Sequence, residues 1–239
     1  MIPAEAAPPT LVPAQAQGLI ESAAELLPAF LEVWGERAVD LRRAAVLVPL
    51  WRWWLRVALA SLMGTPEASN ASDTTLQESC RAWALQRWEP ALEREFMARQ
   101  ERYHLLRYSQ LRLADKDLAH ELGFQLREKE ADFPELNFRY GQAPERKRGG
   151  LMPDLPVSAI PKAIAGVLKG LRPGQVVGPL RLGQELLLLR LEASTPAVLD
   201  QTMRERLLQD LLEEWMAQGD AALLAALDSS ADALLAEAG

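Results

Sequence analysis

The side chains that most often carry out chemistry in proteins are scarce in this chain. It contains one cysteine, Cys80, and two histidines, His104 and His120, among 239 residues. A single cysteine excludes an internal disulfide and a multi-cysteine zinc site, and two histidines leave little for a histidine-based metal site. We therefore predict no bound metal and, since no glycine-rich loop could cradle a phosphate, no organic cofactor. The cysteine and histidine counts fit a reducing compartment, so we predict a cytoplasmic protein.

The charge balance argues against a nucleic-acid partner. The net charge is −7 and the isoelectric point is about 5.1, whereas a protein that binds phosphates in general needs a basic face. Hydrophobic residues make up 49% of the chain and charged residues 25%, which is ordinary for a soluble globular protein.

One apolar segment has nearly the length of a membrane span. Residues 44–63 read AAVLVPLWRWWLRVALASLM and contain Pro49, Arg52 and Arg56. Each central arginine costs about 2.5–3.5 kcal/mol on insertion scales. We interpret the segment as a buried or partner-covered helix with its arginines at the edge. The alternative is an amphipathic helix on a membrane surface.

The first hundred residues predict helices only. Residues 1–17 are rich in proline and alanine and predict a flexible tail. Residues 18–103 carry apolar side chains at spacings of three and four. Within them, a helix from Arg37 to Met63 should bend or break near Pro49. The abundant tryptophans of this region predict a core, with a peptide-binding groove as the alternative.

Residues 104–193 change to a mixture of strands and helices. Tyr108–Leu113 alternates as a strand does, and Asp115 is placed to cap the helix that follows it. The remaining expected elements are, in order, a short helix at 133–140, an irregular stretch at 152–161, a helix at 161–171, and strands at 180–182 and 185–191.

The last 46 residues, 194–239, predict a helix that packs on the N-terminal helices. Thr195 as N-cap and Pro196 at the first helical position are a good start signal. The apolar face that follows is wider than a lone helix could keep in water. We expect Gly219 to end this helix and a short separate helix to follow.

Three segments of the sequence resemble segments of the parvulin-type peptidyl-prolyl cis-trans isomerases. They are Arg148-Gly149-Gly150, the run LKGLRPGQVVGP at 168–179, and the strand ending Arg190-Leu191-Glu192. The resemblance covers about ninety residues and implies an α+β fold with a small sheet. The flanking helices resemble those of chaperone-like bacterial parvulins. Details of the amino-acid sequence are similar to a cyanobacterial branch of this family.

The resemblance also implies where a site would lie. The proline ring would contact Met152, Ile160 and Ile164, which are all apolar. The four polar positions of the family fall on Gln110, Ala143, Leu182 and Leu187, so only the Gln110 amide remains. Since loss of one preorganised donor commonly costs about 2.7–4 kcal/mol of transition-state stabilisation, we expect weak isomerase activity or none.

Three hypotheses follow from these residues. The first is a peptidyl-prolyl isomerase that acts on unfolded or precursor peptides, and the second is a chaperone or escort that holds such peptides without turnover, for example in peptide maturation or export. The third is a membrane-associated scaffold based on the Trp51–Arg56 cluster. The loop Glu145–Arg148 is either solvated or selects acidic residues beside a proline. The oligomeric state is left open.

Overall fold

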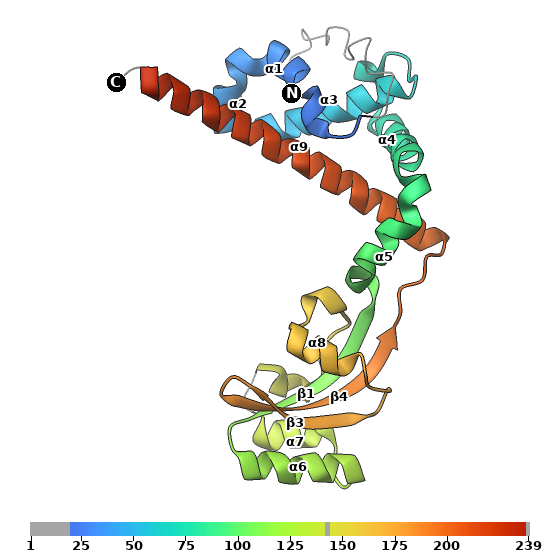
Figure 1. Cartoon of the computed structure of the whole chain (residues 1–239), viewed down its shortest axis with the longest axis vertical. Helices are drawn as coiled ribbons and strands as arrows, with labels where there is room; N and C mark the ends of the chain where they lie inside the picture. Colours follow the sequence, from blue (N-terminus) through green and yellow to red (C-terminus); the bar gives the residue numbers. More distant parts are fainter. Residues whose placement is uncertain (1–19, 142–143, 238–239) are drawn as a thin grey trace. The chain divides into compact units, whose positions relative to one another are not determined.

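The computed structural model describes residues 20–141 and 144–237, without the side chains of residues 145 and 230–237 (Figure 1). The predicted tail at 1–17 and Ala143 therefore lie outside the described residues. The chain divides into two compact units. The first unit combines the residues up to Arg94 with those from Asp200 onward, and the second is Glu95–Leu199. The predicted middle domain, 104–193, falls inside the second unit.

The first unit is helical. Its helices are α1 (Leu27–Trp34), α2 (Ala38–Arg43), α3 (Leu47–Leu62), α4 (Asp73–Trp88) and α9 (Gln201–Glu237). Serine residues cap the N-terminal ends of two helical segments in this unit. Ser22 and Glu25 form a reciprocal capping box before α1, and the Ser72 side chain accepts a hydrogen bond from the Thr75 amide at the start of α4.

The break in the second predicted helix lies before Pro49. Residues 44–46 separate α2 from α3, and Ala45 adopts a positive φ of 57°. Pro49 itself sits in the first turn of α3, where a backbone N–H has no intrahelical acceptor to lose. The helix is thus interrupted near Pro49, as predicted, but at residues 44–46 and not at the proline itself.

The C-terminal helix differs from its prediction at both ends. Thr195 is the last residue of a strand, paired with Leu105. The helix starts at Gln201, where the Asp200 side chain accepts from the Met203 amide at 2.8 Å. It also runs through Gly219 without a break. A Cβ at Gly219 would lie 2.6 Å from the Cβ of Ala23, so the glycine permits close packing and does not end the helix.

Stacked aromatic side chains form the core of the first unit. The rings of Trp51 and Trp54 stack at 5.6 Å, and Phe30 contacts Trp51 edge-on at 4.9 Å. From α9, Trp215 packs against Trp83 at 4.8 Å. Trp51 and Trp54 are almost fully buried, which agrees with the core interpretation of this segment.

The arginines of α3 lie at the edge of this core. Arg52 pairs with Asp220 at 2.7 Å and Glu213 at 2.6 Å, both on α9, and Arg56 pairs with Asp73 at 2.8 Å. Across residues 20–141 and 144–237, no helix is both long and apolar enough to cross a membrane.

The second unit contains one four-stranded antiparallel sheet in the order β2-β1-β4-β3. The strands are β1 (Leu105–Leu113), β2 (Leu155–Pro156), β3 (Val176–Leu182) and β4 (Glu185–Thr195). Strand β3 is longer than predicted, because pairing with β4 resumes after an irregularity at Gly178-Pro179, a cis peptide bond. The α+β class is confirmed.

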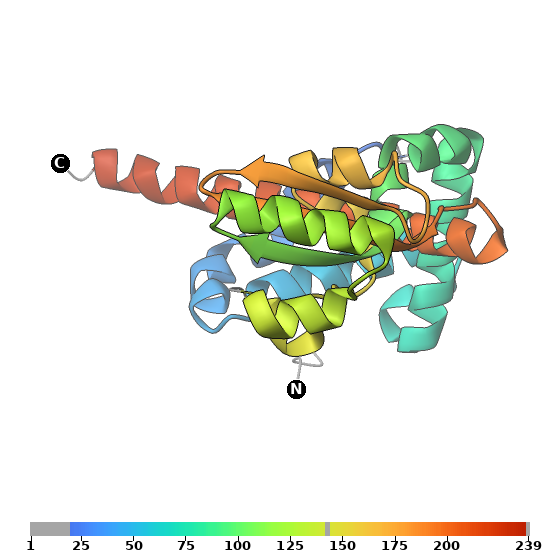
Figure 2. The same cartoon turned by 90° about the horizontal axis from the view of Figure 1, so that it is seen from below.

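Helices cover both faces of this sheet, as Figures 1 and 2 show. Alternate residues of a strand point to opposite faces. From β4, Leu187, Leu189 and Leu191 pack with α8 (Lys162–Leu168). Leu188 packs on the other face, with α6 (Lys116–Glu128) and α7 (Phe133–Tyr140). Helix α5 (Leu92–Tyr103) leads into β1.

Candidate functional site

Gln110 lies at the centre of β1 and is held by its neighbours. It is 2% exposed. Its backbone N–H donates to the Gly150 carbonyl at 2.9 Å, and its carbonyl accepts from the Asn137 side chain at 3.0 Å. Its side-chain Nε2 points to the sulfur of Met152 at 3.7 Å. The amide is therefore fixed next to the first of the predicted ring contacts.

The three apolar residues predicted to contact a proline ring share one cluster. Met152, Ile160 and Ile164 pack with residues of β4, among them Leu187. The two isoleucines are each 4% exposed, whereas Met152 is half-buried. A ligand at this cluster would first meet Met152, since the isoleucines form the layer beneath.

Of the four polar positions implied by the family, the structure describes three: Gln110 keeps an amide, whereas Leu182 and Leu187 are apolar. Leu187 is 1% exposed and Leu182 packs at the edge of the same cluster. Tyr108 packs in the same cluster and carries a phenol hydroxyl. With the adjoining Gln110 amide, the site offers an apolar surface beside a side-chain amide.

The two histidines lie elsewhere. His104 follows α5, and its Nε2 is 2.9 Å from the Ser194 hydroxyl. His120 is exposed on α6. The structure brings together Gln110, Met152, Ile160, Ile164 and Leu187, with Leu182 beside them, but neither histidine joins them.

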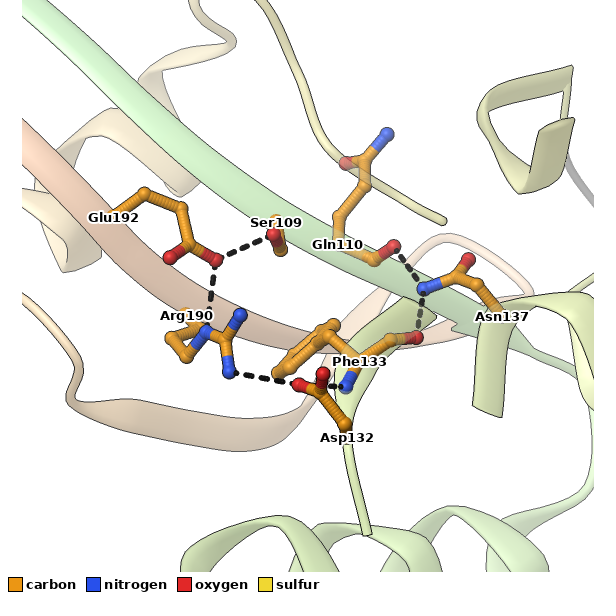
Figure 3. Close-up of polar contacts among 7 residues, drawn as sticks. All are labelled: Ser109, Gln110, Asp132, Phe133, Asn137, Arg190 and Glu192. Carbon is orange, nitrogen blue, oxygen red and sulfur yellow. Dashed lines mark hydrogen bonds and ion pairs between the residues drawn. The ribbon is translucent and has the colours of Figure 1, made fainter. Parts of the chain in front are cut away.

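A buried asparagine that sequence reasoning missed supports this site. Asn137 on α7 is 1% exposed, and its Nδ2 donates to the carbonyls of Gln110 and Phe133 at 3.0 and 3.2 Å (Figure 3). A polar residue among the apolar positions of a short helix was the available signal, because a buried amide requires partners.

The opposite face of the sheet carries a polar network, also drawn in Figure 3. Glu192 accepts from the Ser109 hydroxyl at 2.5 Å and from Arg190 Nε at 2.8 Å. Arg190 lies over the Phe133 ring at 5.1 Å and reaches Asp132 at 3.3 Å. Because its charges are paired with one another, the network explains how β1, β4 and the start of α7 are joined without requiring a ligand.

A hollow of about 1120 Å³ lies next to this network. Its lining mixes cations such as Arg127 and Lys129 with carboxylates such as Glu130 and Glu135. This mixture of signs does not favour one class of charged ligand.

The first unit contains a groove of about 680 Å³ between α4 and α9. Cys80, Leu208, Leu212 and Met216 are among its apolar lining residues, and Arg81 pairs with Glu205 at 2.8 Å near them. Burial raises the pKa of the Cys80 thiol to about 11, so the thiol is protonated at neutral pH and acts as a small apolar group. The groove thus combines an apolar floor with charged groups. Across the described residues, no cluster of histidine, cysteine and carboxylate side chains could hold a metal ion.

Comparison with known families and curated proteins gives no match: no family model fits the chain, and no curated protein is similar to it. Solved structures do show similarity. A PpiC-type peptidyl-prolyl cis-trans isomerase domain is 18% identical, covering 42% of this chain and 99% of that domain, with a TM-score of 0.38.

Two longer structures align with most of the chain. The peptidylprolyl isomerase PrsA from Bacillus anthracis is 15% identical over 87% of this chain and 94% of its own, with a TM-score of 0.44. A structure from the work on PEB4 and Cj1289, two SurA-like chaperones of Campylobacter jejuni, is 15% identical over 91% and 92%, with a TM-score of 0.40. These structures are isomerases and chaperones of the class that the sequence segments resemble. At these identities and TM-scores, the likeness assigns no activity to this chain.

Proposed function

We propose that this protein is a parvulin-like member of the peptidyl-prolyl isomerase family that binds unfolded or proline-containing peptides and has weak isomerase activity or none. The observation that carries the proposal is the cluster in which Met152, Ile160 and Ile164 meet beside the Gln110 amide. An apolar surface next to a fixed amide suits a proline ring and the peptide group that precedes it.

The same cluster supports weak catalysis. Rotation about a prolyl bond needs no covalent step, so an enzyme can accelerate it by desolvating the amide and by placing donors where the rotating carbonyl develops its polarity. Leucine stands at 182 and 187. Since each lost donor is worth about 2.7–4 kcal/mol, two losses would reduce the rate by at least about 10⁴-fold from that of a complete site.

A protease-coupled isomerisation assay on short Xaa-Pro peptides, together with direct peptide binding, tests the proposal. Met152→Ala should weaken binding and remove any turnover above background. Met97→Ala is the matched control, since Met97 is in the same unit and 66% exposed. Peptide binding that is equal in the two variants would contradict the assignment of this site.

The groove of the first unit favours a second candidate, a chaperone or escort that holds its client there. Its apolar floor could accept side chains of an unfolded segment, while its charged groups remain in water. Leu212→Ser should then reduce suppression of client aggregation. Leu85→Ser, on α4 and 43% exposed outside the lining residues, is the control. Equal suppression by both variants would remove the groove from the proposal.

The membrane-associated scaffold loses its main support. It relied on the aromatic side chains of the Trp51–Arg56 cluster, and Trp51 and Trp54 are 0% and 1% exposed in the core of the first unit. The cytoplasmic location and the cyanobacterial branch stay predictions.

A further inference from the structure

A basic turn precedes the glycine pair of the second unit. The 3-10 turn Pro144–Arg148 carries Arg146, Lys147 and Arg148, whose residues are all exposed. The run has three cations against one acid, Glu145, in a chain whose net charge is −7. Such a local excess of positive charge requires an explanation that the overall composition does not give.

The cations of this turn are not neutralised by the rest of the described chain. Arg146 Nε donates to the backbone carbonyl of Phe138 at 2.9 Å, which fixes the turn on α7 but leaves the charge in place. Lys147 and Arg148 make no ion pair with a described residue. The turn therefore presents positive charge to solvent from a fixed position.

The glycine pair anchors the turn to α7 and to the strand β1, which carries Gln110. Gly149 and Gly150 adopt φ of +62° and +80°, and a Cβ on Gly150 would lie 2.3 Å from the Gln110 carbonyl oxygen. Beyond them, the Met152 amide donates to the Tyr108 carbonyl at 2.9 Å. The chain from the turn to Met152 thus runs close to β1 and cannot move away without breaking these contacts.

The distance along the chain limits how far the charges lie from the site. Met152 is four residue steps beyond Arg148, and at about 3.3–3.6 Å per step their Cα atoms are at most about 14 Å apart. A peptide in an extended conformation covers that distance in about four residues. Between the two lies Leu151, which is 42% exposed and available to a passing chain.

We infer that Arg146, Lys147 and Arg148 select peptides with carboxylate side chains about two to four residues from the proline bound at Met152. The inference rests on the proposed function, since it assigns a substrate class to the same site. The alternative, a solvated turn without a partner, predicts no preference between acidic and neutral peptides.

The test is the binding of two fluorescent peptides to the full chain. Both contain one Leu-Pro pair, flanked at two to four residues by glutamates in one peptide and by glutamines in the other. At about 0.01 M salt the glutamate peptide should bind about three- to tenfold more tightly, and the preference should disappear at about 1 M salt, where the screening length is about 3 Å.

Charge reversal locates the effect. The double variant Lys147→Glu, Arg148→Glu should lose the preference. The control is Lys116→Glu, Arg181→Glu, which makes the same change of net charge at two other exposed positions of the second unit and should keep it.

The outcomes separate this inference from the proposed function. Equal binding of the two peptides, or loss of the preference in both double variants alike, would overturn the inference and leave the peptide site intact. Failure of the wild-type chain to bind either peptide would overturn the proposed function and the inference with it.

Discussion

Replacing Gly219 by alanine tests how closely α9 packs on the N-terminal helices. In an exposed helix, glycine to alanine stabilises by about 1 kcal/mol, because alanine restricts the unfolded chain and has the better helix propensity. At Gly219, however, the new Cβ would lie 2.6 Å from the Cβ of Ala23 and 3.2 Å from Trp51 Nε1. Neither atom can rotate away freely, since one is attached directly to the backbone and the other belongs to a fully buried ring.

The magnitude follows from these two opposing effects. Overpacking of a well-packed core costs about 1–3 kcal/mol, and a Cβ–Cβ contact almost 1 Å too short belongs in the upper part of that range. After subtraction of the gain of about 1 kcal/mol from helix propensity, Gly219→Ala should lower the free energy of unfolding by about 1–2 kcal/mol. Gly35→Ala should raise it by about 0.4–1 kcal/mol, because the nearest atom to a Cβ there is 3.9 Å away.

Urea unfolding followed by tryptophan fluorescence measures both variants in the same unit, since all seven tryptophans lie before Glu95 or after Leu199. Opposite signs for Gly219→Ala and Gly35→Ala are the expected result. The double variant Gly219→Ala, Ala23→Gly should recover most of the loss, because it removes the other half of the short contact. A stabilising Gly219→Ala would refute the packing argument.

Three further predictions concern single side chains. Burial raises the pKa of the Cys80 thiol to about 11. Cys80 should therefore react with a thiol reagent at pH 8 only slowly in the native protein and rapidly in urea. Complete reaction of the native protein within the dead time of the measurement would contradict this. Asn137→Ala should cost about 1–3 kcal/mol, since it leaves the buried Gln110 carbonyl without this donor, and an unchanged urea midpoint would exclude that role. Asp115→Ala should cost about 1 kcal/mol through loss of the α6 cap, whereas the exposed Asp117→Ala should cost less, and equal losses would count against capping.

Local signals in the sequence were sufficient for much of the second unit. Alternation in Tyr108–Leu113 and the apolar run at 185–191 identified two central strands, because side chains in a strand alternate between faces and a doubly covered strand is apolar throughout. The grouping of Met152, Ile160 and Ile164 was predicted from the resemblance to the parvulin family and not from hydrophobic periodicity.

Signals that depend on distant packing were misread. Gly219 looked like a helix end because a glycine that follows an apolar face commonly is one, and only the position of Ala23, nearly two hundred residues away, explains its place inside α9. Thr195 and Pro196 looked like a helix start, but the pairing of Thr195 with Leu105 extends the strand. Asn137 was missed because its partner is a backbone carbonyl on another element.

The insertion of the second unit into the first sets an order of events during synthesis. Helices α3 and α4 leave the ribosome before the second unit, and α9, which carries Trp215, follows about 100 residues later. At bacterial or eukaryotic elongation rates, this delay is about 5–20 s. During that interval Cys80 and Trp83 lack the helix that covers them, and the strands of the inserted unit are completed before α9 is. Until α9 has been synthesised, the N-terminal helices therefore expose the apolar surface that α9 covers in the folded unit.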